Sequence, residues 1–147
     1  MAPPASSSRS AGIPDVSSVP DHGDNGAVIE VRTSDLHDRG VFATKDIRKG
    51  TLIVETPMLV LPSSEWKHIS KTTFAHYVFE YGKGTAFAVG PVSFLNHSYT
   101  PNARYWIDED ERTIEIVAIR RIKKGDEVTI NYNADPDDDS PLWFDVD

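Results

Sequence analysis

The chain has 147 residues and a net charge of −8, from 23 Asp and Glu side chains against 15 Lys and Arg. The length predicts one domain, and the absence of cysteine excludes disulfides, thiolate metal sites and cysteine nucleophiles. The acidic balance disfavours direct nucleic-acid binding, which needs a basic face. It suits a basic protein partner and serves solubility equally well.

The first 26 residues are rich in Ser, Pro, Ala and Gly and contain no sustained apolar run. This composition predicts a disordered leader over residues 1–26. The segment lacks the apolar stretch of a secretory signal, so we do not expect secretion. The whole chain has no run of about 18 apolar residues, so we do not expect a membrane span.

From residue 27 onwards the pattern predicts a mostly β fold made of several small sheets. Short runs of β-branched and aromatic residues, separated by Gly, Pro and Asp, are typical of short strands. We expect strands at residues 27–32, 40–43, 51–56 and 85–90, a hairpin over 104–122 with its tip at 108–111, and a last strand within 123–132. Lys49-Gly50 predicts a turn, and Pro57 and Pro62 predict breaks.

One main helix is expected between Glu65 and Tyr81, in the second half of that segment, because its apolar residues approach helical spacing. The acidic C-terminal segment, residues 134–147, ends in an apolar cluster. A purely solvated tail rarely carries such a cluster, so we expect this one to dock on the domain. The cluster consists of Leu142, Trp143, Phe144 and Val146.

The segment FLNHSYTPNARYW, residues 94–106, combines polar and turn-forming residues between apolar runs. Asn96 can donate and accept hydrogen bonds, and Ser98 and Asn102 can satisfy backbone groups in a turn. These residues alone are compatible with a hydrogen-bonded loop that holds a structural His97, or with a ligand site. No second His stands at metal-ligand spacing from His97, so no metal site is expected. Serine-hydrolase, P-loop and dinucleotide-binding motifs are absent.

Three segments in order carry a resemblance: DRGVFATKDIRKGTLIVE, then FLNHSYTPNA, then KKGDEVTINY. Together they resemble the SET-domain protein lysine methyltransferases, and most closely the small stand-alone SET proteins of bacteria and large viruses. The likeness covers about residues 28–147, and we expect a SET domain over residues 27–147. It implies the SET variant of the β-clip fold, with a C-terminal pseudoknot and a short acidic and aromatic tail at 134–147. It also implies transfer of a methyl group from S-adenosylmethionine to a lysine side chain.

The resemblance also implies roles for individual residues. Tyr132 matches the tyrosine at the methyl-transfer site, and Ile130 matches the position that tunes how many methyl groups are added. The cofactor would be held by the backbone around Arg39, with the ring of His97 structural. The implied cofactor-binding residues are Arg39, Gly40, Asn96, His97, Tyr132 and Trp143. The implied substrate-channel residues are Tyr77, Ile130, Tyr132 and Phe144.

One departure from the family pattern opens an alternative function. Asp38 stands where the family has the first glycine of a Gly-x-Gly pair, and its carboxylate could repel the cofactor. A catalytically weak or inactive module that binds basic protein tails is therefore the second hypothesis. A third is a β-clip protein that binds small ligands or sugars and shares only the turn around Lys49.

The expected partner is a basic protein or peptide, such as a histone, a histone-like protein or a ribosomal protein. No direct contact with nucleic acid or membrane is expected. A homodimer is compatible with the sequence, although no feature requires one. The expected location is the cytoplasm, or the nucleus in a eukaryote.

Overall fold

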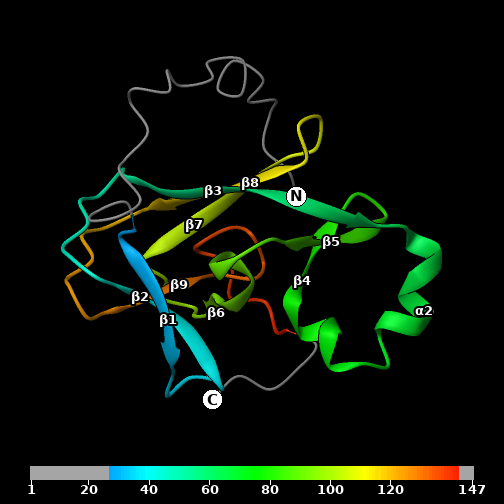
Figure 1. Cartoon of the computed structure of the whole chain (residues 1–147), viewed down its shortest axis with the longest axis horizontal. Coiled ribbons are helices and arrows are strands. Elements are labelled where there is room, and N and C mark those ends of the chain that lie inside the picture. Colours follow the sequence, from blue (N-terminus) through cyan, green and yellow to red (C-terminus); the bar gives the residue numbers. More distant parts are fainter. Residues whose placement is uncertain (1–26, 143–147) are drawn as a thin grey trace.

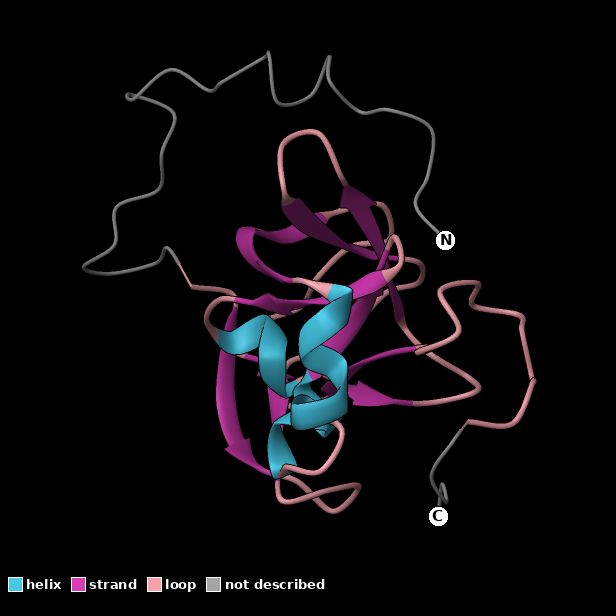
Figure 2. Cartoon of the chain, turned by 90° about the vertical axis from the view of Figure 1, so that its right-hand side faces the viewer, coloured by secondary structure: helices cyan, strands magenta, loops and turns pink. Residues whose placement is uncertain are grey.

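The computed structural model of the chain describes residues 27–142, in which short strands form two sheets (Figure 1). The strands are β1 (Ile29–Thr33), β2 (Arg39–Ala43), β3 (Leu52–Leu61), β4 (Val78–Tyr81), β5 (Gly84–Ala88), β6 (Asn96–His97), β7 (Ala103–Asp108), β8 (Thr113–Ala118) and β9 (Glu127–Ile130). The helical turns are η2 (Ser63–Glu65), α2 (Trp66–Ile69), η3 (Thr73–Tyr77) and η4 (Pro91–Phe94). Seen from the side of α2, the helical turns lie in front of the strands (Figure 2), and η4 packs against β1, β2 and β5. The predicted mostly β fold is confirmed.

The order of the strands places the last strand beside the Asn-His segment. One sheet has the order β1-β2-β9-β6 and the other the order β4-β5-β3-β8-β7. Strands β6 and β9 are parallel neighbours, with Asn96 opposite Thr129 and His97 opposite Ile130. Parallel neighbours need a long connection, and here the β7–β8 hairpin lies within it. Residues far apart in sequence thus meet at the site described below.

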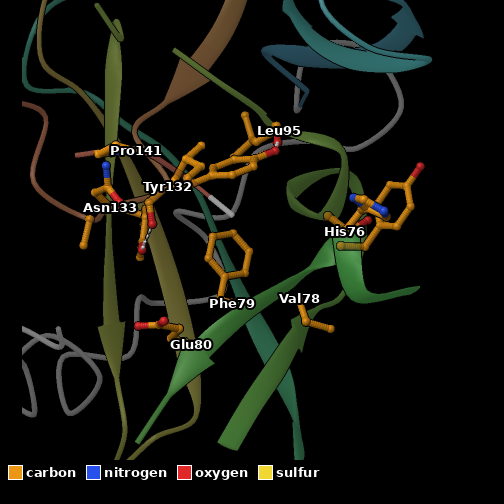
Figure 3. A pocket seen from close by; sticks show the side chains of 13 residues that line it. His76, Val78, Phe79, Glu80, Leu95, Tyr132, Asn133 and Pro141 are labelled. Atoms are coloured by element: carbon orange, nitrogen blue, oxygen red, sulfur yellow. Dashed lines mark hydrogen bonds between the residues drawn. The ribbon is translucent and has the colours of Figure 1, made fainter. Parts of the chain in front are cut away.

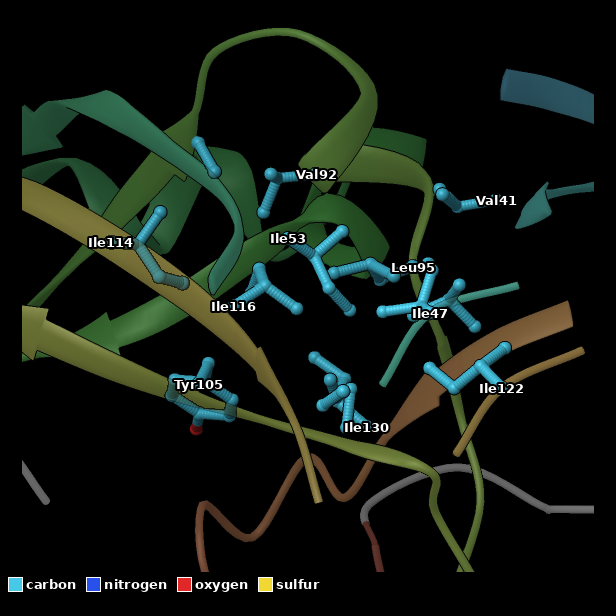
Figure 4. Packing of buried hydrophobic residues seen from close by; sticks show 14 of the residues in the cluster. Val41, Ile47, Ile53, Val92, Leu95, Tyr105, Ile114, Ile116, Ile122 and Ile130 are labelled. Carbon is cyan, nitrogen blue, oxygen red and sulfur yellow. The ribbon is translucent and has the colours of Figure 1, made fainter. Parts of the chain in front are cut away.

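The core lies between the sheets and is built mainly from aliphatic side chains. Ile114 and Ile116 of β8, Val128 and Ile130 of β9, and Ile122 are each fully buried. In Figure 4 the side chains of the labelled Ile residues point into one shared interior. Burying one such side chain stabilises a fold by about 1.5–3 kcal/mol. This core holds in place the strands whose ends carry the site.

The predicted break at Pro62 is confirmed, whereas the predicted break at Pro57 is wrong. Strand β3 runs through Pro57 and ends at Leu61. At Pro57 the strand changes partner: residues up to Pro57 pair with β8, and residues from Met58 onwards pair with β5. A proline is tolerated there because its missing N–H falls at the junction of two ladders.

The expected helix in the second half of residues 65–81 is also corrected. The α-helix occupies the first half and spans only Trp66–Ile69, followed by the 3-10 turn η3 and strand β4. Val78 and Phe79 pair with Phe87 and Ala86 of β5. Aromatic and β-branched residues suit such a pleated surface, so sheet pairing overrides the helical spacing of the apolar residues. No helix within residues 27–142 is long and apolar enough to span a membrane.

Candidate active site

Tyr132 is held at both its backbone and its side chain. It follows β9, and its N–H donates to Nδ1 of His97 at 3.0 Å. Its hydroxyl donates to the carbonyl oxygen of Leu95 at 2.6 Å. The ring is therefore fixed between the end of η4 and the Asn-His segment, and rings held in this way can position a reacting group.

Burial raises the pKa of the Tyr132 hydroxyl well above its usual range, with a smaller contribution from Tyr77. The hydroxyl therefore stays protonated throughout the physiological pH range. It can donate a hydrogen bond or orient a dipole, but it is not a phenolate base. A positioning and electrostatic role follows from this protonation state.

A pocket with a volume of about 300 Å³ opens beside Tyr132, and four of its thirteen lining residues are Tyr or Phe. Its lining residues are His76, Tyr77, Val78, Phe79, Glu80, Ser93, Leu95, Tyr105, Tyr132, Asn133, Ala134, Pro141 and Leu142. Figure 3 shows Tyr132 between Leu95 and Asn133, with Phe79 and Glu80 on the β4 side. Phe79 packs edge-on against Tyr105 at a centroid distance of 5.0 Å. The size lies at the lower end for ligand pockets.

A second, much smaller hollow adjoins this pocket. It holds about 20 Å³ and shares five lining residues with the first: His76, Tyr77, Ser93, Leu95 and Tyr132. Arg39 and Asn96 line it as well. Because Tyr132 lines both hollows, it stands where groups bound in each would meet. The sequence-predicted residues Arg39, Asn96, Tyr77 and Tyr132 are thus brought together.

The amide of Asn96 has a defined orientation because only acceptors surround its nitrogen. Nδ2 donates to Oε2 of Glu127 at 2.7 Å, to the carbonyl of Arg39 at 2.9 Å and to Oγ of Ser34 at 3.2 Å. The Ser34 hydroxyl accepts here because it donates its own proton to Glu127. The amide oxygen of Asn96 is therefore the atom left for the hollow. An acceptor at that position fits a cationic or N–H donor group.

The hydrogen-bonded group of Asn96, Glu127 and Ser34 leaves no room for a side chain at Gly40. A Cβ added at Gly40 would lie 2.8 Å from Cδ of Glu127 and 2.9 Å from Nδ2 of Asn96. Both distances are shorter than real side-chain contacts. The missing side chain of Gly40 therefore makes room for the Glu127 carboxylate, which the sequence motifs did not single out.

His97 is 7% exposed, and its ring belongs to the supporting structure. Nδ1 accepts from Tyr132, so the neutral ring carries its proton on Nε2, which has no partner within residues 27–142. Burial lowers the pKa of His97. The ring also packs edge-on against Tyr99 at a centroid distance of 4.3 Å. A neutral His97 is thus part of what holds Tyr132.

Two asparagines that sequence reasoning missed direct the C-terminal segment to the pocket. Asn131 donates to the carbonyl of Asp138 at 2.6 Å, and Asn133 donates to the carbonyl of Ser140 at 2.9 Å. Tyr99 donates to the same Ser140 carbonyl at 3.0 Å. These bonds bring the following residues, Pro141 and Leu142, into the pocket wall. The available signal was the Asn-Tyr-Asn triplet at the end of a strand, next to a loop.

The remaining predicted residues fall elsewhere. Ile130, implied for the substrate channel, is fully buried in the core and lines neither hollow. Trp143 and Phe144 lie outside the described residues. Asp38 is exposed and lines neither hollow, and its φ is not positive. The replacement of glycine at Asp38 therefore introduces no left-handed backbone strain.

Comparisons with known proteins place the chain in a family. The SET-domain profile matches residues 38–133. A fission-yeast protein (Schizosaccharomyces pombe), named as an H3 lysine-37-specific histone-lysine N-methyltransferase, is 30% identical over 118 residues, covering 79% of this chain and 76% of that protein. The H3 lysine-36-specific enzyme of Saccharomyces cerevisiae is 31% identical over 107 residues, covering 65% of this chain but 15% of its own length. The chain belongs to the SET-domain family.

Solved structures support the fold. A crystal structure of a candidate histone methyltransferase from Plasmodium falciparum superimposes with a TM-score of 0.59 at 23% identity, covering 72% of this chain and 93% of that one. The ctPRC2 assembly in complex with H3K27me3 and H3K27M contains a chain that superimposes with a TM-score of 0.61 at 24% identity, covering 72% of this chain and 14% of that one. At these identities the likeness concerns the fold.

Proposed function

We propose that this protein transfers a methyl group from S-adenosylmethionine to the side-chain amine of a lysine in a basic protein, with a histone as the leading candidate. One observation carries the proposal: Tyr132 lines both the larger pocket and the hollow beside Asn96. A methyl donor on one side and a lysine on the other would then meet at Tyr132. The names of the relatives support lysine methylation as the reaction class.

The cofactor side fits one end of S-adenosylmethionine. When bound, that molecule supplies a methyl group on a sulfonium, whose transfer forms an N–C bond, breaks the S–C bond and leaves a neutral thioether. The amide oxygen of Asn96 would accept a hydrogen bond from the ammonium of its amino-acid end, with the backbone of Arg39 and Gly40 alongside. The hollow of about 20 Å³ has room for only a small group, so most of the cofactor would lie over the open surface. The backbone of His97 and, beyond the described residues, Trp143 are proposed contacts.

The substrate side must favour a neutral amine. With a reference pKa of about 10.4, only about 0.1% of a solvated lysine is neutral near pH 7.4. Removal from water lowers that pKa because it disfavours the ammonium. The rings of Tyr77, Phe79 and Tyr105 would provide this desolvation, while the exposed carboxylate of Glu80 at the rim would attract the incoming cation. The proton would leave to water, and no residue is required as a dedicated base.

The proposed substrate class and location follow from the relatives rather than from the pocket. Both yeast proteins are named for lysines of histone H3. A histone substrate would place the protein in the nucleus of a eukaryotic cell. The remaining candidates are histone-like and ribosomal proteins in the cytoplasm. Phe144 is a proposed further contact to the substrate, and Ile130 could influence methyl number only through packing.

The inactive-module alternative rests on Asp38 and has weaker support. The Asp38 side chain is exposed and lines neither hollow, so repulsion of a cofactor carboxylate would act at a distance through water. Cofactor titration separates the two functions. A tail-binding module would bind basic peptides without binding S-adenosylmethionine.

The test uses calorimetry with S-adenosylmethionine, followed by transfer of labelled methyl groups to a mixture of histones and other basic proteins. Tyr132→Phe removes the hydroxyl at the junction of the hollows, and Tyr81→Phe is a matched control. The Tyr81 hydroxyl also donates to a backbone carbonyl, that of Glu109 at 2.7 Å, but it lies outside both hollows. We expect cofactor binding in all three proteins and a loss of transfer of about 100-fold or more only in Tyr132→Phe. Absence of cofactor binding in the parent protein would overturn the proposal.

A further inference from the structure

Two short segments with the same pattern form facing turns on the surface. Ile47-Arg48-Lys49-Gly50 and Ile122-Lys123-Lys124-Gly125 each place an isoleucine in the core, two cations outside and a glycine with φ of +87° or +90°. Ile47 and Ile122 form an antiparallel bridge, with N–H···O distances of 2.7 and 2.9 Å in the two directions. The bridge brings together turns that are 75 residues apart in sequence.

This pairing collects nearly half of the basic residues of an acidic protein on one surface, which we call the basic surface. Seven of the 15 Lys and Arg belong to it, and all seven are exposed: Lys45, Arg48, Lys49, Arg120, Arg121, Lys123 and Lys124. The carboxylates within the two turns are Asp46 and Asp126. In Figure 1 the turns lie at the edge of the molecule opposite α2. None of the seven cations lines the pocket.

Only part of this positive charge is compensated internally. Asp46 pairs with Arg121 at 2.7 Å and also accepts from the backbone N–H of Lys124 at 2.9 Å, so it ties the two turns together. The Arg120 guanidinium donates to the carbonyls of Thr100 and Pro101. The other five cations form no ion pair within residues 27–142. A fixed group of uncompensated cations attracts a polyanion.

The composition of the surface indicates which polyanion it fits. Its exposed side chains are charged, and aromatic or large aliphatic groups are missing from residues 45–50 and 120–126 apart from the buried Ile47 and Ile122. Single-stranded nucleic acid is bound by stacking on aromatic rings, and interfacial membrane binding combines inserted apolar side chains with cations. A purely cationic surface suits the phosphate backbone of a duplex, which carries one charge per about 1.7 Å of axis.

We propose that the two bridged turns form a sequence-independent binding surface for the phosphate backbone of double-stranded DNA. Phosphate contact from Lys45, Arg48, Lys49, Lys123 and Lys124 would hold the protein on a duplex while the pocket stays open at a different face. A surface of this kind would keep a histone-directed enzyme close to DNA-packaged substrates. The binding is measurable without cofactor or substrate, so it stands or falls separately from methyl transfer.

The experiment measures fluorescence anisotropy of a labelled duplex of about 20 base pairs, titrated with the full chain at several salt concentrations. We expect binding at about 50 mM salt, with log K falling against log salt at a slope of about −4, as for four to five phosphate contacts. The basic-surface variant is Lys123→Glu/Lys124→Glu, and the control is Lys67→Glu/Lys71→Glu, which makes the same charge change at exposed positions in and beside α2.

The basic-surface variant should lose at least tenfold in affinity for DNA and show a shallower salt slope, while the affinity of the control variant stays within about twofold of the parent protein. Thermal melting checks that both are folded, and Lys45→Gln/Lys49→Gln repeats the test on the other turn. Equal losses in the basic-surface and control variants would overturn the proposal, because only net charge would then matter. The proposal would also be overturned if the parent protein failed to bind DNA at low salt, or if it bound anionic vesicles or a polyglutamate peptide instead of DNA.

Discussion

Replacing Gly40 with alanine tests the cluster that orients Asn96. The added methyl group would lie 2.8 Å from Cδ of Glu127, so the Glu127 carboxylate must move. It would lose its hydrogen bonds from Ser34 and Asn96, both 2.7 Å long. Hydrogen bonds to a charged group contribute about 1.5–3 kcal/mol each. Because the carboxylate is only partly buried and can regain water, we expect a loss of about 2–4 kcal/mol in the free energy of unfolding.

The same displacement should weaken cofactor binding. Without Glu127, the amide of Asn96 is held by fewer acceptors, so its orientation is less firmly fixed. Each 1.4 kcal/mol lost is tenfold in affinity, so a fall of about tenfold is expected for S-adenosylmethionine. Urea unfolding measures the stability, and calorimetry measures the affinity.

Gly50→Ala is the matched control. Gly50 has φ of +87° and no atom near the added Cβ, so alanine there meets backbone strain but no clash. Strain of this kind costs about 1–2 kcal/mol and should leave cofactor affinity unchanged. The double variant Gly40→Ala/Glu127→Ala should be more stable than the sum of its single changes predicts, since it removes the clashing carboxylate. Additive effects, or a Gly40→Ala loss no larger than that of Gly50→Ala, would refute the reasoning.

Three further predictions concern residues around Tyr132. Burial lowers the pKa of His97, so the unfolded chain takes up a proton at a higher pH than the folded chain. The free energy of unfolding should therefore stay constant above about pH 6.5 and fall below it, by at most about 1.4 kcal/mol per pH unit. Urea unfolding at several pH values measures this, and the His97→Gln variant should lose the dependence. Asn133→Ala removes one of the two side-chain hydrogen bonds to the Ser140 carbonyl, leaving that from Tyr99, and should raise KM for a substrate peptide several-fold with little change in kcat; a fall in kcat at constant KM in steady-state assays would contradict this. Ala134 has φ of +74°, so Ala134→Gly should raise the unfolding free energy by about 0.5–1 kcal/mol, and an unchanged or lower melting temperature would argue against strain there.

The sequence by itself determined the strand-rich character, the family and the motif residues of the site. Short runs of β-branched residues between Gly and Pro are local signals, and the hairpin with its tip at residues 108–111 is confirmed by β7 and β8. The Asn96-His97 segment could be recognised because its residue types are unusual between apolar runs. These features depend on neighbours along the chain, which a sequence displays directly.

Other features depended on partners far away along the chain. Residues 78–81 became a strand because β5 offers an edge to pair with, and the apolar spacing that predicted a helix could not reveal that edge. The fully buried position of Ile130 depends on the parallel pairing of β6 and β9, which local sequence does not display. The roles of Glu127, Asn131 and Asn133 likewise appear only when their hydrogen-bond partners are in place.

The charges of the protein likewise have one property that the sequence gives directly and one that depends on the fold. The sequence determined the net charge of −8, and that sum alone argued against contact with nucleic acid. Only the tertiary structure decided where the charges lie, because the bridge between Ile47 and Ile122 brings two basic segments together. Electrostatic interactions are screened over about 10 Å at 0.1 M salt, so a partner responds to the local surface it touches rather than to the total.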